Sequence, residues 1–584
     1  MVMAASTGLH TATSAQQTGA PAPASPAPAE AQTTLGGILV LGSTALPVSQ
    51  VSAAAGPFIG QPVTPALLQQ VRLAVSDAHD DAGVALVSVD APFMVGTTAL
   101  IRVQQLRLAA ITVGLPAGAA APIKVPPAVA AQAMAALPAL RAGETPNLKT
   151  LDRELRLANL QPHRRISVDF RWSDSATQTA APAGSPALPA PARVPLGPSS
   201  ANVQGRPIAS AADIPAAVPI TRLPGFSETQ DDASMLDARI LVSDSTPYYG
   251  RVLVDNAGQP ATGRQRLRLQ VGHGDLLGPG RALDITTLVS ITHPERQHQF
   301  ALRYQHPLPA AATLLSAEAS ISRSRPGLVN EFFDVSGNSK IANISVRRLL
   351  PRSGTLEPYI EAGFEMAEHN DVVNFFGVNL GSKVGTAPLS VTLAATWQND
   401  RSNAFGQLRV RRNTGLGGLA TAARYNAARF GATPDWTTLE AFAVFRSATG
   451  KGQEFVLRAQ GQLTGDALIA PQQFRAGGQN FMRGLIESEM AGDSGAAATL
   501  EYWGTLAPGH RLAGFVDGAV AGRNKALANE VGTLSALSAG IAYQWTIRPG
   551  LQLNLAGARV MTARNLPQSE AGDTRLLVLL EWAL

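Results

Sequence analysis

The chain has 584 residues, of which 45% are hydrophobic and 15% are charged, and its formal net charge is +5. It is long enough for several domains, but a mild positive charge spread over this length is not the dense basic surface that duplex binding requires, so we expect no nucleic-acid partner. No run of about 18 apolar residues occurs, so we expect no transmembrane helix, and any lipid contact must come from short alternating strands. The absence of cysteine is compatible with a cell-envelope protein.

Residues 1–34 consist mainly of Ala, Ser, Thr, Gln and Pro and end in a Pro/Ala-rich run at 20–31. Such a composition can bury almost nothing and predicts disorder. The basic start, apolar core and cleavage site of a secretory signal peptide do not occur here. We expect a signal peptide outside the given sequence or a misassigned start codon, with a cytosolic protein as the alternative.

A first small α+β module is predicted over residues 35–110. Thr64 and Pro65 are typical of a helix N-cap followed by the first helical residue, and Gly83 is typical of the end of that helix. The buried side of the helix is predicted to consist of Leu68, Val71, Leu73 and Val75. Strands are predicted at 38–41, 84–89 and 98–113.

A second module with a similar pattern is predicted over residues 111–246. Asn147 is the expected N-cap of a helix with apolar residues at helical spacing, and strands follow at 165–171 and 238–242. The segment 173–234 between those strands is rich in Pro, Ala, Ser and Gly, which predicts a long disordered or extended insert in a surface loop. Two similar modules in tandem suggest a repeat.

The pattern changes to serial alternating strands over residues 247–584. Val252 and Val254 face one way, whereas Arg251, Leu253 and Asp255 face the other. About 335 residues follow Gly250, and at roughly 20 residues per strand and connection they form about 16 strands. The same alternation recurs around residues 267–271, 283–291, 300–305, 360–366 and 391–397.

The last nine residues form a strand with one wholly apolar face. Leu576, Val578, Leu580, Trp582 and Leu584 lie on that face, and the opposite face carries Leu577, Leu579, Glu581 and Ala583. This pattern favours hydrocarbon outside and a mixed surface inside, as in an antiparallel transmembrane β-barrel. The alternative is a soluble antiparallel sandwich, but a terminal strand that closes a cylinder and removes its edges favours the barrel.

A glycine-rich loop with a central arginine, Arg483, is predicted at 474–495. We expect no catalytic residue, metal or cofactor: the segment Gly492–Gly495 matches the tetrapeptide around a trypsin-like nucleophile, but the partner His segment and the cysteines of that family are missing. Gly477 and Gly478 are not followed by the Gly-Lys-Ser/Thr ending of a phosphate-binding loop. An arginine in such a loop is otherwise an ordinary solvated residue.

With its neighbours, the loop resembles that of the two-partner secretion outer-membrane transporters, the hemolysin secretion/activation family. Met482-Arg483-Gly484-Leu485 is similar to the family's loop tip, with Leu485 in place of an aromatic residue, and the flanking Gly477-Gly478 and Gly492-Asp493 also match. The family has Phe-x-Asp on the next strand, here Phe515-Val516-Asp517. The resemblance implies that the loop folds into the barrel and that Arg483 pairs with Asp517, which a guanidinium can do through two parallel hydrogen bonds.

The resemblance covers nearly the whole chain after residue 35. The two modules look like paired polypeptide-transport-associated (POTRA) domains, and Asp255-Asn256-Ala257-Gly258 looks like the first barrel hairpin. The insert interrupts the second domain, and Leu584 replaces the usual terminal aromatic residue. The resemblance implies that the last strand, with Trp582 and Leu584, is recognised by the barrel-assembly machinery.

The implied function is transport without chemistry. The POTRA domains would lie in the periplasm of a Gram-negative bacterium and capture a secreted exoprotein through its N-terminal secretion domain, and a monomeric barrel among outer-membrane lipids would export it. No nucleotide site is expected, so the energy would come from folding of the exoprotein outside. The alternatives are an insertase of the same superfamily and a passive pore. The stripe of Arg264, Arg266 and Arg268 is interpreted as a polar lumen wall that balances Asp284 and Glu361, or as a guide for the unfolded substrate.

Overall fold

A computed structural model describes most of the chain and divides it into two compact units, residues 1–78 with 89–104 and residues 79–88 with 105–584. The predicted disordered segment and the Pro/Ala-rich insert lie almost entirely outside the described residues. Those residues are 33–43, 46–84, 86–116, 125–160, 163–173, 235–244, 246–329, 333–375, 378–379, 381–528 and 530–584.

The first module is a small sheet with helices. Its strands are β1 (Gly37–Leu41), β2 (Val87–Val89), β3 (Phe93–Val95) and β4 (Thr98–Gln105), in the order β1-β4-β2 with β3 paired to β4. Its helices are α1 (Val48–Ala55), η1 (Gly56–Phe58) and α2 (Pro65–Asp81). Thr64 begins α2 as predicted, because its hydroxyl oxygen accepts a hydrogen bond of 3.1 Å from the Leu67 N–H.

The buried side of α2 differs from the prediction at two positions, because Leu67 is buried in place of the half-buried Leu68 and Leu73 is exposed. Leu67, Val71 and Val75 are 5%, 0% and 0% exposed, and they follow one another at four-residue spacing on one helix face. Leu73 is 51% exposed, so its predicted burial is wrong. It lies two residues from both Val71 and Val75, which places it on the opposite side of a helix.

The predicted strand at 98–113 is two strands. β4 ends at Gln105, and after the buried Leu106 the strand β5 (Arg107–Gly114) joins the sheet of the second module. The buried positions change parity at the break, from Ala99, Ile101 and Val103 to Leu106 and Leu108, and the two consecutive glutamines at 104–105 were the sign of it in the sequence. The domain limits predicted from the sequence, 35–110 and 111–246, remain predictions.

The second module packs two helices on a three-stranded sheet. Its elements are α3 (Pro127–Ala135), α4 (Leu148–Ala158), β6 (Arg164–Trp172) and β7 (Met235–Asp244), and the strand order is β5-β7-β6. Asn147 caps α4 as predicted, accepting a 3.0 Å hydrogen bond from the Thr150 N–H. The apolar face of α4, including Leu151 and Leu155, is buried in the core of this module.

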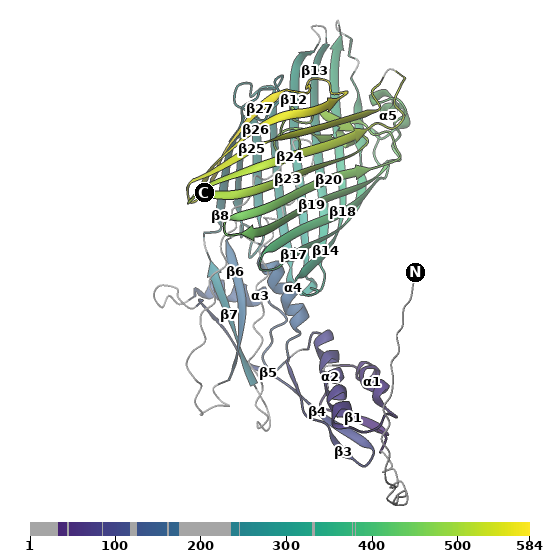
Figure 1. Cartoon of the computed structure of the whole chain (residues 1–584), viewed down its shortest axis with the longest axis vertical. Coiled ribbons are helices and arrows are strands. Elements are labelled where there is room, and N and C mark those ends of the chain that lie inside the picture. The colour runs from purple at the N-terminus through teal and green to yellow at the C-terminus, as the bar shows by residue number, and fades with distance from the viewer. Residues whose placement is uncertain are drawn as a thin grey trace, which may run out of the picture. The chain divides into compact units, whose positions relative to one another are not determined.

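The rest of the chain is a closed antiparallel barrel whose strands lie side by side in Figure 1. Its described wall comprises eighteen labelled segments; β15 and β16 line the same side of β14 as β17 and count with it as one strand, which leaves sixteen. The segments are β8 (Tyr248–Asp255), β9 (Arg266–His273), β10 (Leu283–Ser290), β11 (Gln297–Leu308), β12 (Thr313–Val329), β13 (Phe333–Leu349), β14 (Leu356–Phe375), β15 (Val378–Asn379), β16 (Lys383–Thr386), β17 (Pro388–Gln398), β18 (Ser402–Asn413), β19 (Thr437–Gly450), β20 (Gln453–Leu463), β23 (Ser494–Ala507), β24 (His510–Gly522), β25 (Thr533–Arg548), β26 (Leu551–Arg564) and β27 (Thr574–Ala583).

The connections of the barrel carry short elements of their own. They are η4 (Pro309–Ala311), α5 (Ala422–Ala428), η5 (Ala470–Gln472), β21 (Phe474–Ala476) and β22 (Met490–Gly492). None of the helices in the described part of the chain is long and apolar enough to cross a membrane.

The predicted alternation of the last strand is confirmed. Leu576 and Trp582 are 64% and 41% exposed on the outer face, whereas Leu577 and Leu579 are each 2% exposed on the inner face. β27 pairs with β8 and closes the wall, so no strand edge remains open there. The fold class expected from the sequence, mainly β with a barrel of about sixteen strands after two small α+β modules, is therefore confirmed.

Within the second unit, the second module contacts one end of the barrel. Arg156 of α4 donates hydrogen bonds to the carbonyls of Leu350 and Pro358, at 2.9 and 3.3 Å, beside the turn that joins β13 to β14. Arg164 forms a 3.0 Å ion pair with Asp275 in the turn that follows β9. We call this the module end of the barrel and the opposite end the loop end.

Glu154 of α4 generates the first prediction. It is 1% exposed, and its burial raises its pKa from 4.5 to about 7, although a hydrogen bond from the Ala139 N–H opposes the shift. A raised pKa means that the folded state favours the neutral acid, so the stability of this module falls as pH rises from about 4.5 through about 7. Glu154→Gln should abolish this loss.

The measurement is hydrogen–deuterium exchange of the α4 peptides in the full chain at about pH 5 and about pH 8. At each pH the variant is compared with the native chain, which removes the intrinsic pH dependence of exchange. Protection should be equal at the lower pH and greater in the variant at the higher pH. Glu144→Gln, at an exposed carboxylate, is the matched control, and equal protection of native and Glu154→Gln chains at both pH values would contradict the prediction.

Candidate functional site

The candidate site is the connection between β20 and β23, residues 464–493. These two strands pair directly in the wall, so the connection between them must lie inside or outside the barrel. Its tip is inside: Met482, Arg483 and Leu485 are 0%, 4% and 0% exposed. The short strands β21 and β22 pair with each other and form the base of this loop. The inward-folding loop was expected from the resemblance.

Glycines permit the tight fold of the loop. Gly477 has a φ of +129°, and a Cβ there would lie 2.2 Å from the carbonyl oxygen of Ile486. Its N–H donates to the carbonyl of Phe481 at 3.1 Å, and that of Gly478 to the carbonyl of Leu485 at 3.2 Å. Any other residue at 477 would strain the backbone and collide with the returning chain.

Arg483 binds Asp517 on β24 in a forked geometry. Its Nε donates to Oδ2 at 3.0 Å, its Nη2 donates to Oδ1 at 2.6 Å, and its backbone N–H donates to Oδ2 at 2.9 Å. Asp517 is 0% exposed. Three charge-assisted hydrogen bonds to one carboxylate fix both the side chain and the backbone of the loop tip.

Glu501 on β23 is a second carboxylate at the same guanidinium. Arg483 Nη1 donates to Glu501 Oε1 at 2.8 Å, and Trp503 Nε1 donates to Oε2 at 2.8 Å. Arg458 on β20 also forms an ion pair with Glu501. Two arginines therefore face two carboxylates, so the cluster is balanced in charge despite its burial, which is the condition under which buried ions are tolerated.

An aromatic ring completes the cluster. The guanidinium carbon of Arg483 lies 3.3 Å from the centroid of the Phe515 ring, and Phe515 is 4% exposed. Phe515 lies opposite Glu501 in the wall, and Asp517 lies opposite Thr499, so all these side chains point inward from two neighbouring strands. A guanidinium over an aromatic face gains electrostatic stabilisation that increases when water is excluded.

The loop tip approaches the wall so closely that only glycine fits at 484. A Cβ there would lie 2.9 Å from both Ser538 Cβ and Val560 Cγ2 on the wall. Met482, two residues before Gly484, has a φ of +65°, a conformation that costs a residue with a side chain of order 1 kcal/mol or more. Met482 and Leu485 are buried in an apolar cluster with wall residues, including Val560, and this burial holds the strained turn.

Two acidic residues after the tip bind other parts of the barrel, one a wall strand and the other the connection between β26 and β27. Glu487 forms an ion pair with Arg266 on β9, which also donates to Asp255 at 2.9 Å. Glu489 accepts hydrogen bonds from the N–H and the hydroxyl of Ser569, at 2.7 and 2.6 Å. The positive charges of the arginine stripe were interpreted as balancing Asp284 and Glu361. Arg266, a member of the stripe, instead balances the negative charge of Glu487 in the loop.

Gly492 and Asp493 lie at the base of the loop, in a cluster of their own. Asp493 is 0% exposed, and its carboxylate accepts two bonds from Arg429, next to α5, and one each from the N–H groups of Leu468 and Asn524, at 2.9 and 2.6 Å. A Cβ on Gly492 would lie 2.7 Å from the carbonyl oxygen of Gly522. This cluster joins three connections of the loop end.

The predicted site residues therefore fall into three groups. Arg483, Gly484 and Asp517 lie together in the lumen, with Gly477 and Gly478 shaping the loop behind them. Gly492 and Asp493 lie at the loop base. Trp582 and Leu584 lie on the outer face at the closing strand, where the Leu584 N–H donates to the Gly250 carbonyl at 2.9 Å.

A family model described as the haemolysin secretion/activation protein ShlB/FhaC/HecB matches residues 237–543, more than half of the chain. The chain belongs to this family. Its members are outer-membrane β-barrel transporters. No curated protein sequence matches the chain significantly.

Solved structures with the same fold include two CdiB proteins. CdiB from Escherichia coli superposes with a TM-score of 0.69 at 16% identity, and the match covers 94% of this chain and 90% of that chain. CdiB from Acinetobacter baumannii gives a TM-score of 0.66 at 14% identity, with the same two coverages. At these identities the likeness shows the fold alone.

In this ShlB/FhaC/HecB family member, part of the cluster around Arg483 was not predicted from the sequence. Glu501 and Arg458 were not singled out, and Phe515 was quoted without a role. The signal available was the parity of the strands, because Glu501 and Asp517 occupy inward positions of predicted neighbours. Arg429 gave no such signal, since it lies in a connection far from Asp493 along the sequence.

Gly484 generates the second prediction. Gly484→Ala should push the loop tip away from the wall, because overpacking a close contact costs about 1 to 3 kcal/mol. We expect larger or more frequent open states of the barrel in planar bilayers than for the native chain. Gly504→Ala is the matched control, because a Cβ there meets nothing within 4 Å. Identical conductance of native chain and Gly484→Ala variant would contradict the close packing.

Proposed function

We propose that this protein is the outer-membrane transporter of a two-partner secretion system, which captures one exoprotein through its two modules and exports it through the barrel. The observation that carries the proposal is the loop anchored inside a barrel of this family by Arg483, Asp517 and Glu501. The module end faces the periplasm of a Gram-negative bacterium and the loop end faces outside. The modules act as POTRA domains, and the barrel is a monomer inserted by the barrel-assembly machinery.

Sheet edges in the second module are suited to capture of an extended chain. The sheet order leaves β5 and β6 at the edges of the described sheet. Part of the outer edge of β5 is occupied, because Leu108 exchanges backbone hydrogen bonds with Gly143 and Glu144. On β6, the side chain of Asn159 hydrogen-bonds both backbone groups of Ile166, and the Arg165 guanidinium donates to the Arg164 carbonyl at 3.0 Å. We assign residues 167–171 of β6 as the segment to which the exoprotein adds its backbone, a mode that gives affinity with little demand on sequence.

The lumen offers a polar path once the loop moves. Inward positions carry ion pairs such as Arg347 with Glu361 and Arg411 with Glu365, at 2.8 and 3.0 Å. A polar interior keeps an unfolded chain from adhering to the wall. The Arg483 loop occupies the lumen at rest, so export requires it to rearrange. Folding of the exoprotein outside supplies the energy, as expected from the family resemblance.

Arg483 generates the third prediction. Arg483→Ala should reduce secretion of the exoprotein encoded beside this transporter by at least about tenfold, because it leaves the buried Asp517 carboxylate without its guanidinium partner and Glu501 with Arg458 alone, a loss of about 3 to 5 kcal/mol. Arg483→Lys should restore only part of the export, because an ammonium cannot make the forked contact. The measurement is the exoprotein in the medium, normalised to the amount of heat-modifiable barrel.

Arg475→Ala is the matched control, because Arg475 lies in the same loop and donates to the carbonyl of Ala470 rather than to a carboxylate. Normal export by Arg483→Ala at unchanged barrel levels would contradict the proposed role of the loop. An insertase would instead show defects in the assembly of other outer-membrane barrels when the gene is deleted. A passive pore would show conductance without any effect on a neighbouring exoprotein.

A further inference from the structure

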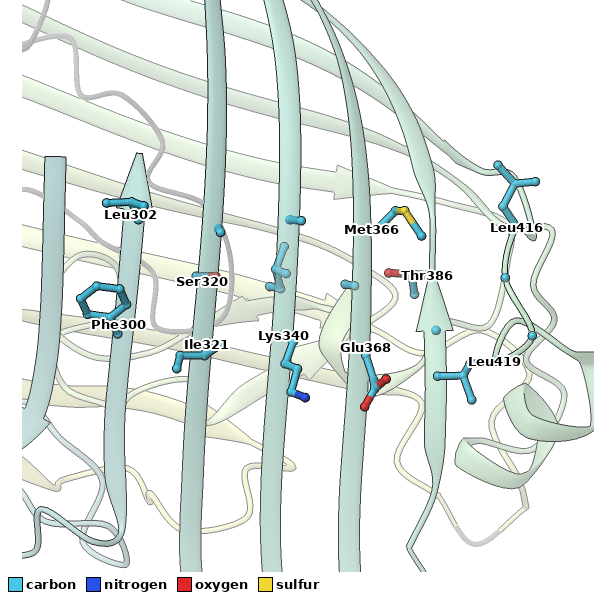
Figure 2. A pocket seen from close by; sticks show the side chains of 17 residues that line it. Phe300, Leu302, Ser320, Ile321, Lys340, Met366, Glu368, Thr386, Leu416 and Leu419 are labelled. Atoms are coloured by element: carbon cyan, nitrogen blue, oxygen red, sulfur yellow. The ribbon is translucent and has the colours of Figure 1, made fainter. Parts of the chain in front are cut away.

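The outer face of the barrel carries a cavity of about 650 Å³ on β11 to β14 and β16, shown in Figure 2. The strand register places its residues in two rows that face outward. One row consists of Leu302, Ala319, Ala342 and Met366, and the next row toward the loop end consists of Phe300, Ile321, Lys340, Glu368 and Gly385. This volume lies within the usual range of about 300 to 1,000 Å³ for small-molecule pockets.

The cavity is lined both by the wall and by a neighbouring connection. Ala319 and Ala342 make a depression between the larger Leu302 and Met366. The connection after β18 then runs beside β16, where the Leu419 carbonyl accepts a 3.1 Å hydrogen bond from the Gly385 N–H. We call residues 416–419 the shelf.

Gly385 allows the shelf to pack closely beside β16. A Cβ at Gly385 would lie 2.9 Å from the Cβ of Leu419. Leu416 on the shelf is 58% exposed and faces the same cavity as Ile321 and Met366, which are each 53% exposed. Apolar side chains thus line the cavity on the wall and at its side, so it suits a hydrocarbon chain.

Positive charge gathers at the edge of the cavity nearest the loop end. Lys340 is exposed there, and the next row along the strands carries Arg323 and Lys383. Lys383 is neutralised by Glu368 at 2.9 Å. Arg323 Nε is buried without a hydrogen-bond partner, and no ion pair of Lys340 within 4 Å is found among the described residues. The positive charges of Arg323 and Lys340 therefore remain at the edge of the apolar cavity nearest the loop end. Figure 2 shows Lys340 beside Glu368 at this rim.

We propose that this cavity binds a phosphorylated, multiply acylated glycolipid of the outer leaflet, of the lipid A type. Its phosphate would bind Lys340 and Arg323, and one acyl chain would lie over Ala319 and Ala342 beside the shelf. The polarity matches, because the cations lie toward the loop end and the apolar part toward the membrane interior. The inference rests on the membrane orientation proposed above, but not on export.

The fourth prediction concerns this site. In native mass spectrometry of the full chain in detergent, titrated with diphosphorylated lipid A, the double variant Arg323→Ala/Lys340→Ala should bind about 25-fold more weakly. Each basic residue near a membrane surface is worth about 1 kcal/mol, which is about fivefold in affinity. Arg348→Ala is the matched control, because Arg348 lies exposed on the same face of β13 but at the module end. It should leave the affinity unchanged.

Ala342→Trp tests the apolar part of the site, since the indole would fill the depression. It should abolish lipid A binding while the barrel stays folded by heat modifiability in SDS gels. Two other lipids, phosphatidylethanolamine and dephosphorylated lipid A, should each bind the native chain as weakly as lipid A binds the double variant. Inorganic phosphate should not compete at millimolar concentrations, because it lacks the acyl chains.

Equal binding of lipid A by the native chain and the double variant would overturn the proposal. So would an equal loss in the Arg348→Ala control, unchanged binding by Ala342→Trp, or equal affinity for dephosphorylated lipid A. Exoprotein secretion by the double variant separates the two proposals. Normal secretion with weakened lipid A binding supports the lipid site, whereas absence of secretion by the native chain would count only against the proposed function.

Discussion

The buried ion pair between Arg483 and Asp517 is the constraint on which the rest of the lumen depends. A guanidinium away from water is tolerated only when carboxylates compensate it, and removing one partner leaves an uncompensated charge that costs about 3 to 5 kcal/mol. Glu501 and the ring of Phe515 complete this compensation. Because the backbone N–H of Arg483 binds the same carboxylate, the loop tip and its side chain are held as one unit. A loop fastened in this way occupies the lumen until several bonds break together.

The wall provides the compensating groups because strand side chains alternate. Every second residue faces the lumen, so carboxylates on β23 and β24 converge on one point while their neighbours face hydrocarbon. Closure by β27 and β8 satisfies the backbone that would otherwise form an open edge. The same alternation builds the outer cavity, where alanines on neighbouring strands fall in one row and the shelf lies beside them. The charged cluster in the lumen and the apolar cavity on the outer face thus both follow from the alternation of side chains along the strands.

Much of this fold could be predicted, and the failures have physical reasons. The caps at Thr64 and Asn147 were readable because a side-chain oxygen before an apolar helix satisfies free N–H groups locally. Leu73 was predicted to be buried and is exposed, because its hydrophobicity was given more weight than its position two residues from both Val71 and Val75, which lies on the opposite side of the helix. The break between β4 and β5 was missed although the buried positions change parity between Val103 and Leu106, because both segments alternate and only the phase of the pattern differs. The partner of Arg483 was expected from a family resemblance, whereas the second carboxylate, Glu501, was not expected at all.

The sequence by itself determined the class of the protein: alternating strands, a closing terminal strand and a glycine-rich loop with one arginine. These are local patterns, because period two and backbone freedom at glycine are properties of short segments. Only the tertiary structure decided that Arg266 balances Glu487, that Arg429 holds Asp493 and that residues 416–419 lie beside a row of alanines. Such pairs join residues far apart in the chain, and their meeting is set by the strand register and by the paths of the connections. Neither the strand register nor the path of a connection can be predicted from the pattern of one segment.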